Sequence, residues 1–298
     1  MHNGNDGGSL EEATREFTKA SPRLFGIAYR VLGSAVEAED VVQEAWLRWQ
    51  NTDRRTIREP AAFLATVTTR LAINLSQSAR MRRESYIGPW LPDPLDTAAD
   101  PQVGAERAEA LDLAVLFLLE KLNAVERAAY VLREAFAYSY KEIAAILETS
   151  EGNTRQLVSR ARKHLSSERR EPVSSDAHRR LLEVFLAAAQ NGDLRGLEEV
   201  LTTDVVSYAD GGGVRGASRI PVFGREHVSK YLVAFAPRFW HETEVHWVEV
   251  NGRPAVLISA DGKPMALLCV DASDRGIERI MWVLNPDKLN RYVTSPIG

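Results

Sequence analysis

The spacing of apolar residues changes once along this 298-residue chain, and that change limits the fold more than any other feature. Up to about residue 170, apolar side chains recur every three or four positions, which is the period of an amphipathic helix. Beyond Val205 they form short alternating runs bounded by Gly, Pro, Asn or Asp, which is typical of β-strands. With 45% apolar residues, the chain is long enough for more than one core. The sequence therefore predicts helical domains followed by an α+β domain.

Capping motifs and a proline locate the first helices. Ser34 and Glu37 are spaced as a capping box ahead of an apolar stripe that contains Trp46 and Trp49, which we assign to the core. A polar loop over residues 51–59 precedes a second helix that begins at Pro60, because proline is tolerated in a first helical turn. We place the end of this first domain, residues 10–84, where the second helix reaches an arginine cluster.

A linker and a helix-turn-helix follow. Glycine and proline recur between residues 85 and 101, and no helix interior accepts that composition, so we assign 85–104 to a linker. The helical pattern resumes at Ala105 and continues through Phe117. Later helix starts are given by Asn123 with Glu126, by Ser139 with Glu142, and by Thr149 with Ser150. Short helices joined this tightly predict a helix-turn-helix within a second domain, residues 105–170.

The third domain, residues 176–298, is predicted to combine helices with a sheet. An apolar helix over 181–189 is followed by Asn191-Gly192-Asp193, which reads as a helix stop and restart. Asn251-Gly252 and Asp261-Gly262 are favoured hairpin turns, so a meandering antiparallel sheet is expected. The expected strands are Val205 to Tyr208, Thr243 to Val250, Ala255 to Ser259, Met265 to Val270, and Ile277 to Leu284.

Charge and cysteine content narrow the class of protein. A single cysteine, Cys269, excludes an internal disulfide and a cysteine-rich metal site, and no apolar run approaches the length of a membrane span. We expect a cytoplasmic protein without a metal or cofactor. Residues 1–172 carry 23 basic and 25 acidic side chains, so their net charge is −2. Basic residues nevertheless cluster at 70–83 and 153–170, and such patches bind phosphates locally while the surrounding acid disfavours DNA binding at large.

The segment after Ser150 separates its residues into two helical faces. Thr154, Leu157, Val158, Ala161 and Leu165 form the apolar stripe. The opposite face and its flanks hold Arg155, Gln156, Ser159, Arg160, Arg162 and Lys163. As the second helix of a helix-turn-helix, this face would enter the major groove, where Arg and Gln form paired hydrogen bonds with base edges. The alternative is a solvated basic helix without a DNA role.

Several separated motifs resemble bacterial sigma factors of the extracytoplasmic-function (ECF) type. They are Ala38-Glu39-Asp40-Val41-Val42-Gln43-Glu44-Ala45-Trp46-Leu47, residues 60–74, Ser139-Tyr140-Lys141-Glu142-Ile143-Ala144 and Ser159-Arg160-Ala161-Arg162. The resemblance covers residues 10–170 and implies that 10–84 bind core RNA polymerase and the −10 element, while 105–170 read the −35 element. Asn74 and Thr154 depart from the family pattern, which has Asp and Val at these positions.

The resemblance also implies roles for individual residues. Asp40, Gln43 and Glu44 fall in the segment that docks on the polymerase. The loop 51–59 and the polar side of the next helix fall where such factors open the −10 duplex, which requires a base pocket and phosphate-binding groups. The residues assigned to the −10 element are Thr66, Arg70, Asn74, Arg80, Arg82 and Arg83.

Three further motifs resemble the sigma-J-like subgroup, whose members carry a fused SnoaL-like domain. They are Trp90-Leu91-Pro92-Asp93-Pro94, Asp210-Gly211-Gly212-Gly213 and Asn285-Pro286-Asp287-Lys288-Leu289. The resemblance implies that the third domain regulates the sigma domains in cis, through contacts made by Trp90, Pro92, Pro94, Asp210, Gly211, Gly212, Gly213, Asn285, Asp287 and Lys288. Inhibition and activation both remain open.

The third domain is expected to bind rather than to catalyse. Related cones that act on ketones need a buried carboxylate, and the last strands offer Met265, Cys269, Met281 and Trp282 instead. Asp204, Tyr208, Asp210 and His227 remain as candidates, each with a commoner structural explanation. Trp240, Trp247 and Trp282 could line an apolar pocket for a small ligand, although core packing is their commoner role.

The sequence is thus identified as a sigma factor that directs promoter-specific initiation with core RNA polymerase. One rival is a free-standing helix-turn-helix regulator with a ligand domain, which predicts tight DNA binding without polymerase; the acidic first half disfavours it. Another is a small-molecule enzyme with a DNA-binding appendage, for which no clear buried acid is found.

Overall fold

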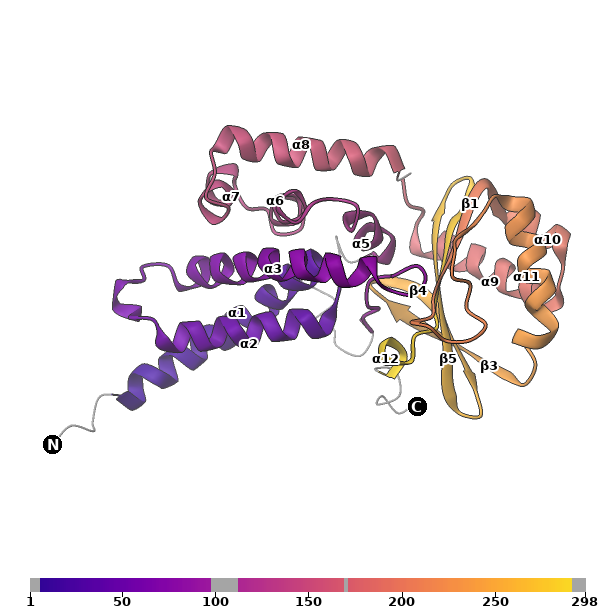
Figure 1. The fold of residues 1–298 in the computed structure, drawn as a ribbon, viewed down its shortest axis with the longest axis horizontal. Coiled ribbons are helices and arrows are strands. Elements are labelled where there is room, and N and C mark those ends of the chain that lie inside the picture. The colour runs from indigo at the N-terminus through magenta and orange to yellow at the C-terminus, as the bar shows by residue number, and fades with distance from the viewer. Residues whose placement is uncertain (1–5, 98–111, 169–170, 291–298) are drawn as a thin grey trace. The chain divides into compact units, whose positions relative to one another are not determined.

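The computed structural model describes residues 6–97, 112–168 and 171–290, which form two compact units (Figure 1). The first unit contains 6–84 and 115–168, and the second contains 85–97, 112–114 and 171–290. The expected linker therefore belongs, as far as it is described, to the same unit as the C-terminal domain. No helix in the described ranges is long and apolar enough to span a membrane.

Three long helices begin the first unit. They are α1 (Asp6–Leu32), α2 (Ala35–Asn51) and α3 (Pro60–Glu84), with a short 3-10 turn at Arg54–Thr56 between the last two. Pro60 starts α3 as predicted, and Ser34 accepts a hydrogen bond from the Glu37 amide as the N-cap of α2. The Glu37 carboxylate pairs with Arg82 and Arg83.

The helix-turn-helix completes the first unit. It follows α5 (Leu113–Leu119) and α6 (Ala124–Glu134), and it comprises α7 (Tyr140–Ile146) and α8 (Glu151–Glu168). Both halves of the Ser139–Glu142 capping box are present, and Asn123 caps α6 as predicted. The expected helix start at Ala105 lies outside the described residues. Trp49 and Leu64 share one core with Ile143 and Leu157, so the two helical regions pack on each other.

The second unit is a six-stranded sheet with helices. The strands are β1 (Leu201–Asp210), β2 (Val222–Phe223), β3 (Thr243–Val250), β4 (Arg253–Ala260), β5 (Lys263–Ser273) and β6 (Gly276–Val283), in the spatial order β2-β1-β6-β5-β4-β3. The helices are α9 (Ser175–Asn191), α10 (Leu194–Val200), α11 (Arg225–Phe239) and α12 (Pro286–Leu289). Gly192 ends α9 in the left-handed conformation and Asp193 caps α10, as the stop-and-restart motif predicts.

The sheet differs from the expected meander at one pairing. Strands β3 to β6 form the antiparallel meander, but β1 pairs with β6 in parallel. A parallel partner requires a long crossover, and here the connection from β1 to β6 runs through α11 and the four other strands. Helix α11 and the two-residue β2 were not predicted from the sequence, and the glycine-rich segment before them obscured the helical period.

Alternation along the strands gives the sheet two different faces. Val256, Leu268, Ile280 and Trp282 form the main core with helix residues such as Phe185. Helices α9, α10 and α11 lie on one side of the sheet (Figure 1). The opposite face of the same strands lies on the side of α12 (Figure 1). The C-terminal part is thus the α+β domain that the change of period predicts.

Gly276 tests the packing between α10 and the β5–β6 turn. Its φ of +120° disfavours any other residue, and an added Cβ would lie 2.5 Å from the Val200 carbonyl oxygen. Gly276→Ala should therefore destabilise the C-terminal domain by about 3 kcal/mol or more in urea unfolding. Gly262→Ala is the matched control, because Gly262 has a φ of +69° and open space around it, so only about 1 kcal/mol is expected. Equal losses would contradict the steric argument.

Candidate functional site

The recognition helix α8 presents the basic face that the sequence predicts. The five residues of the apolar stripe are all buried. Arg155, Gln156, Ser159, Arg160, Arg162 and Lys163 are all exposed. Arg155 pairs with Glu151, Arg160 pairs with Glu126 at 2.9 Å, and Arg162 pairs with Glu134 at 2.7 Å. This surface is therefore accessible to DNA, and three of its guanidinium groups already have an acidic partner.

Side-chain caps fix the turn that orients α8. The pKa of Glu142 is lowered because the Ser139 side chain and backbone donate hydrogen bonds to its carboxylate. Glu148 adopts a positive φ of +52° in the turn, and the Thr149 amide closes the turn onto the Ala144 carbonyl at 3.0 Å. The Asn153 amide then donates to the Ser150 hydroxyl at 3.1 Å at the start of α8. The angle between α7 and α8 is thus set by local hydrogen bonds as well as by the core.

The polar side of α3 brings three of the predicted −10 residues onto one strip. Thr66, Arg70 and Asn74 are spaced four residues apart, and Asn74 is exposed. The Arg70 guanidinium donates to the carbonyl oxygens of Ile146 at 2.8 Å and Ala145 at 3.1 Å, and pairs with Glu148 at 2.8 Å. Arg70 therefore binds the C-terminal end of α7, in the region assigned to the −35 element.

The arginines at the end of α3 are engaged within the first unit. Arg82 pairs with Glu37. Arg83 pairs with Glu120, donates to the Leu32 carbonyl oxygen, and has a side chain that is only 16% exposed. Arg80 lies on the same helix, with its side chain outside the described part of the structure. Sequence analysis missed these ion pairs because Glu37 and Glu120 lie 45 and 37 residues from their partners.

The residues assigned to polymerase binding lie on the outer face of α2. Asp40 and Gln43 are exposed, while Glu44 is partly buried and pairs with Arg48 at 2.9 Å. The opposite face of α2 buries Val41, Ala45 and Trp49. The helix therefore leaves its acidic side available for another protein.

A linker-binding site lies in the second unit and is formed by Asp210, Asn285 and Lys288. Asp210 ends β1 and is fully buried. Its carboxylate accepts hydrogen bonds from the Tyr86 hydroxyl and from the Leu91 amide at 2.9 Å, and it pairs with the Lys288 ammonium at 2.8 Å. A buried carboxylate needs such partners. Two of the three, Tyr86 and Leu91, belong to the linker.

Lys288 forms the other half of the linker-binding site. Its ammonium donates to the Leu91 carbonyl oxygen, lies 3.5 Å from Asp93, and sits 4.3 Å from the centre of the Trp90 ring. Cation–π contact and two carboxylates together compensate the burial of the charge. Asn285 donates to the Tyr86 hydroxyl at 2.9 Å. Burial and the neighbouring Asp210 raise the pKa of Tyr86, which stays protonated as a donor.

The remaining predicted regulatory residues have different positions around this site. Pro92 and Pro94 are buried. Gly212 has a φ of +54°, and an added Cβ would lie 2.7 Å from the Asn285 side chain. A Cβ on Gly211 would lie 2.4 Å from Ala217. A Cβ on Gly213 would lie 3.6 Å from Ile87, in ordinary contact. Asp287 is exposed and donates its backbone amide to the Asn285 side chain.

The far part of the linker is bound by residues that sequence analysis did not identify. Asp96 forms a β-bridge with Val250, and the Leu95 amide donates to the Asn251 side chain at 2.9 Å. Asp112, where the described chain resumes, pairs with Arg253 at 3.5 Å. The hairpin turn already accounts for an asparagine at position 251. Nothing in the sequence therefore indicated that Asn251 also binds the Leu95 amide. The C-terminal domain therefore holds the chain on both sides of residues 98–111.

None of the candidate catalytic residues lines the aromatic pocket described below. The Asp210 carboxylate is hydrogen-bonded to the Leu91 amide of the linker. His227 is exposed at the start of α11. Asp204 and Tyr208 lie on β1 outside the lining of the aromatic pocket described below. Among the described residues, no cluster of three or more His, Cys, Asp or Glu side chains could hold a metal ion.

Comparisons with known proteins agree with this geometry. Residues 17–83 match the family Sigma-70 region 2, and residues 112–165 match Sigma-70, region 4. The chain is 34% identical to "ECF RNA polymerase sigma factor SigJ" of Mycobacterium tuberculosis over 95% of this chain and 94% of that protein, and 30% identical to the probable ECF sigma factor SigI over 90% and 91%. The crystal structure of SigJ has a TM-score of 0.75 and 31% identity, covering 96% of this chain and all of that one.

Two helical regions, the second with a helix-turn-helix, define a transcription initiation factor of the sigma-70 class. The chain belongs to the ECF sigma factors of RNA polymerase and is similar to SigJ. Sigma factors are not enzymes; they bind core RNA polymerase and promoter DNA and direct the initiation of transcription. The resemblance stated from the motifs is thereby confirmed.

Lys288→Met tests the linker-binding site through stability. The variant leaves Asp210 buried without its cationic partner, so we expect the C-terminal domain to lose about 3–5 kcal/mol of unfolding free energy. The double variant Asp210→Asn with Lys288→Met removes both charges and should recover part of that loss. Lys230→Met is the control, because Lys230 is exposed and pairs only with Glu226 one helical turn away. A loss for Lys288→Met no larger than for Lys230→Met would contradict the assignment.

Proposed function

We propose that this protein is a cytoplasmic sigma factor whose C-terminal domain regulates initiation in cis by holding the linker between regions 2 and 4. The observation that supports this most directly is the buried pair of Asp210 and Lys288, whose partners include Tyr86, Trp90 and Leu91 of the linker. The buried charges of the C-terminal domain thus depend on linker residues for part of their hydrogen bonds and contacts.

The proposed DNA contacts follow from exposure and chemistry. Gln156, Ser159 and Lys163 would read the −35 element with the arginines of α8, because these side chains are exposed on one helical face. Thr66, Arg70 and Asn74 would contact the −10 element, with Arg80, Arg82 and Arg83 near the phosphates. Asp40, Gln43 and Glu44 would bind the polymerase.

Reading both elements at once requires a change in the first unit. The elements lie about 25 base pairs apart, which is roughly 85 Å of B-form DNA. Arg70 of α3 is bound to Ile146 at the end of α7 and to Glu148, so the helix proposed to contact the −10 element is attached to the helix-turn-helix proposed to read the −35 element. We infer that this contact is released in the initiation complex, and that the C-terminal domain influences how far the two regions separate because it binds both ends of the linker.

Transcription in vitro with purified core RNA polymerase tests the whole proposal. Fragments from the protein's own gene neighbourhood would serve as templates for the full chain, for a chain that ends near Pro172, and for Lys288→Met. Defined transcripts that require the protein are expected, and releasing the linker should change their yield in the same direction in both altered chains. Lys230→Met should behave as the unchanged protein. Tight DNA binding without polymerase, together with no transcript, would favour a stand-alone regulator.

Gln156→Ala tests the role of α8. Loss of one paired hydrogen bond with a base should reduce promoter-directed transcription by the equivalent of about 1–3 kcal/mol. Gln190→Ala provides the control, since Gln190 is another exposed glutamine on a helix, in the C-terminal domain. Substituting single bases of the −35 element should reduce transcription by the unchanged protein. At the base that Gln156 contacts, the same substitution should not reduce transcription by the Gln156→Ala variant any further. Equal activity of the two glutamine variants would remove Gln156 from the recognition surface.

A further inference from the structure

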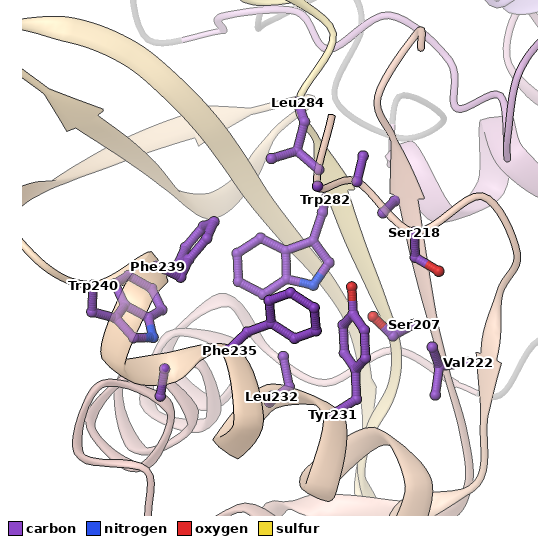
Figure 2. Close-up of a pocket in the computed structure, with 14 residues that line it drawn as sticks. Ser207, Ser218, Val222, Tyr231, Leu232, Phe235, Phe239, Trp240, Trp282 and Leu284 are labelled. Atoms are coloured by element: carbon purple, nitrogen blue, oxygen red, sulfur yellow. The ribbon is translucent and has the colours of Figure 1, made fainter. Parts of the chain in front are cut away.

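The C-terminal domain encloses an aromatic pocket that the sigma activity does not use (Figure 2). Tyr231, Leu232 and Phe235 of α11 form one wall, and Trp282 of β6 forms another. Phe239 packs edge-on against Trp282 with ring centres 5.4 Å apart, which holds the indole in place. Of the three tryptophans considered from the sequence, Trp240 and Trp282 line the pocket and Trp247 does not.

The pocket has a few polar groups in its lining. Figure 2 shows the hydroxyl groups of Tyr231 and Ser207 and the indole of Trp282 among the side chains that line it. Among the described residues, none accepts a hydrogen bond from the Trp282 indole NH, and none is bonded to the Ser207 hydroxyl. Trp282 is only 7% exposed and Ser207 only 5%. Donors that line a pocket without a protein partner favour a ligand that brings an acceptor.

The lining excludes charged ligands and argues against catalysis. Within the described ranges, no Asp, Glu, His, Lys or Arg side chain lines the pocket. Burial raises the pKa of Tyr231, so this hydroxyl remains neutral at physiological pH. A carboxylate or ammonium group would lose its hydration here and gain no countercharge. The fitting ligand is therefore uncharged.

The size of the pocket limits the part of the ligand that it can enclose. The cavity volume is about 70 Å³, compared with the roughly 150 Å³ of a cavity that accommodates benzene. A group as small as an acetyl or ethyl group would therefore enter, while an attached ring lies at the mouth. Phe235, which is 41% exposed, offers an apolar surface there.

The walls of the pocket continue into the linker-binding site. Ala217 and Ser218 line the pocket, and the other side of their loop contacts the linker, where a Cβ on Gly88 would lie 3.7 Å from the Ser218 carbonyl oxygen. Ala209 and Leu284 also line the pocket, next in sequence to Asp210 and Asn285. The Leu284 amide donates to the Asp210 carbonyl oxygen at 2.8 Å.

We propose that this pocket is an effector site for an uncharged, largely apolar molecule with one carbonyl-type hydrogen-bond acceptor, whose binding tightens the hold of the C-terminal domain on the linker. The ligand's oxygen accepts from the Trp282 indole and the Ser207 hydroxyl, while its apolar part packs between Trp282 and Phe235. The consequence for transcription rests on the proposed function, but the binding site itself does not.

Fluorine NMR titration of the full chain with para-fluoroacetophenone tests the site. Para-fluoroethylbenzene, which lacks the acceptor, and para-fluorobenzoate, which is charged, are the matched probes. We expect the ketone to bind more tightly than either. Trp282→Phe should weaken ketone binding by about three- to tenfold, the value of one hydrogen bond, and leave ethylbenzene binding nearly unchanged. Val222→Trp, at the pocket edge, should abolish binding of all three probes.

Trp247→Phe is the control variant, because Trp247 packs against the same core outside the pocket, beneath Arg179. It should leave the affinity for the ketone unchanged. Equal binding of the three probes, an equal effect of Trp247→Phe and Trp282→Phe, or no binding of the ketone would each overturn the assignment of the site.

Amide hydrogen exchange on the same samples tests the link to the linker. The Leu91 amide is bonded to the Asp210 carboxylate, so its exchange reports opening of the linker-binding site. Saturating ketone should slow exchange at Leu91 and leave the amides of α6 unchanged. Binding without any change at Leu91 would overturn the coupling. Because neither measurement involves polymerase, failure here is distinct from failure of the transcription assay.

Discussion

The ion pair between Asp210 and Lys288 is the interaction on which the C-terminal domain and the linker jointly depend. Asp210 is fully buried and Lys288 is 8% exposed, so neither charge can rely on water. Their mutual attraction alone rarely compensates for the loss of hydration, and additional hydrogen bonds are needed. The linker supplies hydrogen bonds through Tyr86 and Leu91 and a cation–π contact through Trp90. Detaching the linker would therefore leave the buried ion pair without part of its hydrogen bonds, so the attached state is strongly preferred. Because Asp210 ends β1 and Lys288 lies in α12, attachment is also sensitive to any shift of these two elements.

This dependence connects three sequence motifs that lie far apart in the chain. The linker motif, the end of β1 and the turn before α12 meet because β1 and β6 are parallel neighbours, so that their C-terminal ends lie together. The expected all-antiparallel sheet would have placed these ends on opposite edges. The sequence did not predict this parallel pairing, and it is the feature of the sheet that assembles the linker-binding site.

Most of the local structure could be predicted, whereas most of the long-range contacts could not. Caps such as Ser139 and Asn123, and the apolar stripe of α8, specify helices through residues three or four positions apart. The linker-binding residues were found only through a family resemblance, because Lys288 and Asp210 have no local pattern that brings them together. Asn251 and Arg253 had no signal at all, since a hairpin turn already accounts for the first. Helix α11 was not predicted, because the glycine-rich segment that precedes it obscured its helical period.

The pairing of surface arginines bears on the proposed DNA contacts, because it would disfavour DNA binding by the chain alone. Arg155, Arg160 and Arg162 of α8 each hold an acidic partner, and Arg70 holds Glu148. Each guanidinium must exchange a carboxylate for a phosphate, so counterion release from DNA is offset by the loss of an internal pair. The exchange becomes favourable only where other contacts position the helix on DNA, and core polymerase provides that position for a sigma factor. Net acidity and basic patches are thus two parts of one specificity mechanism.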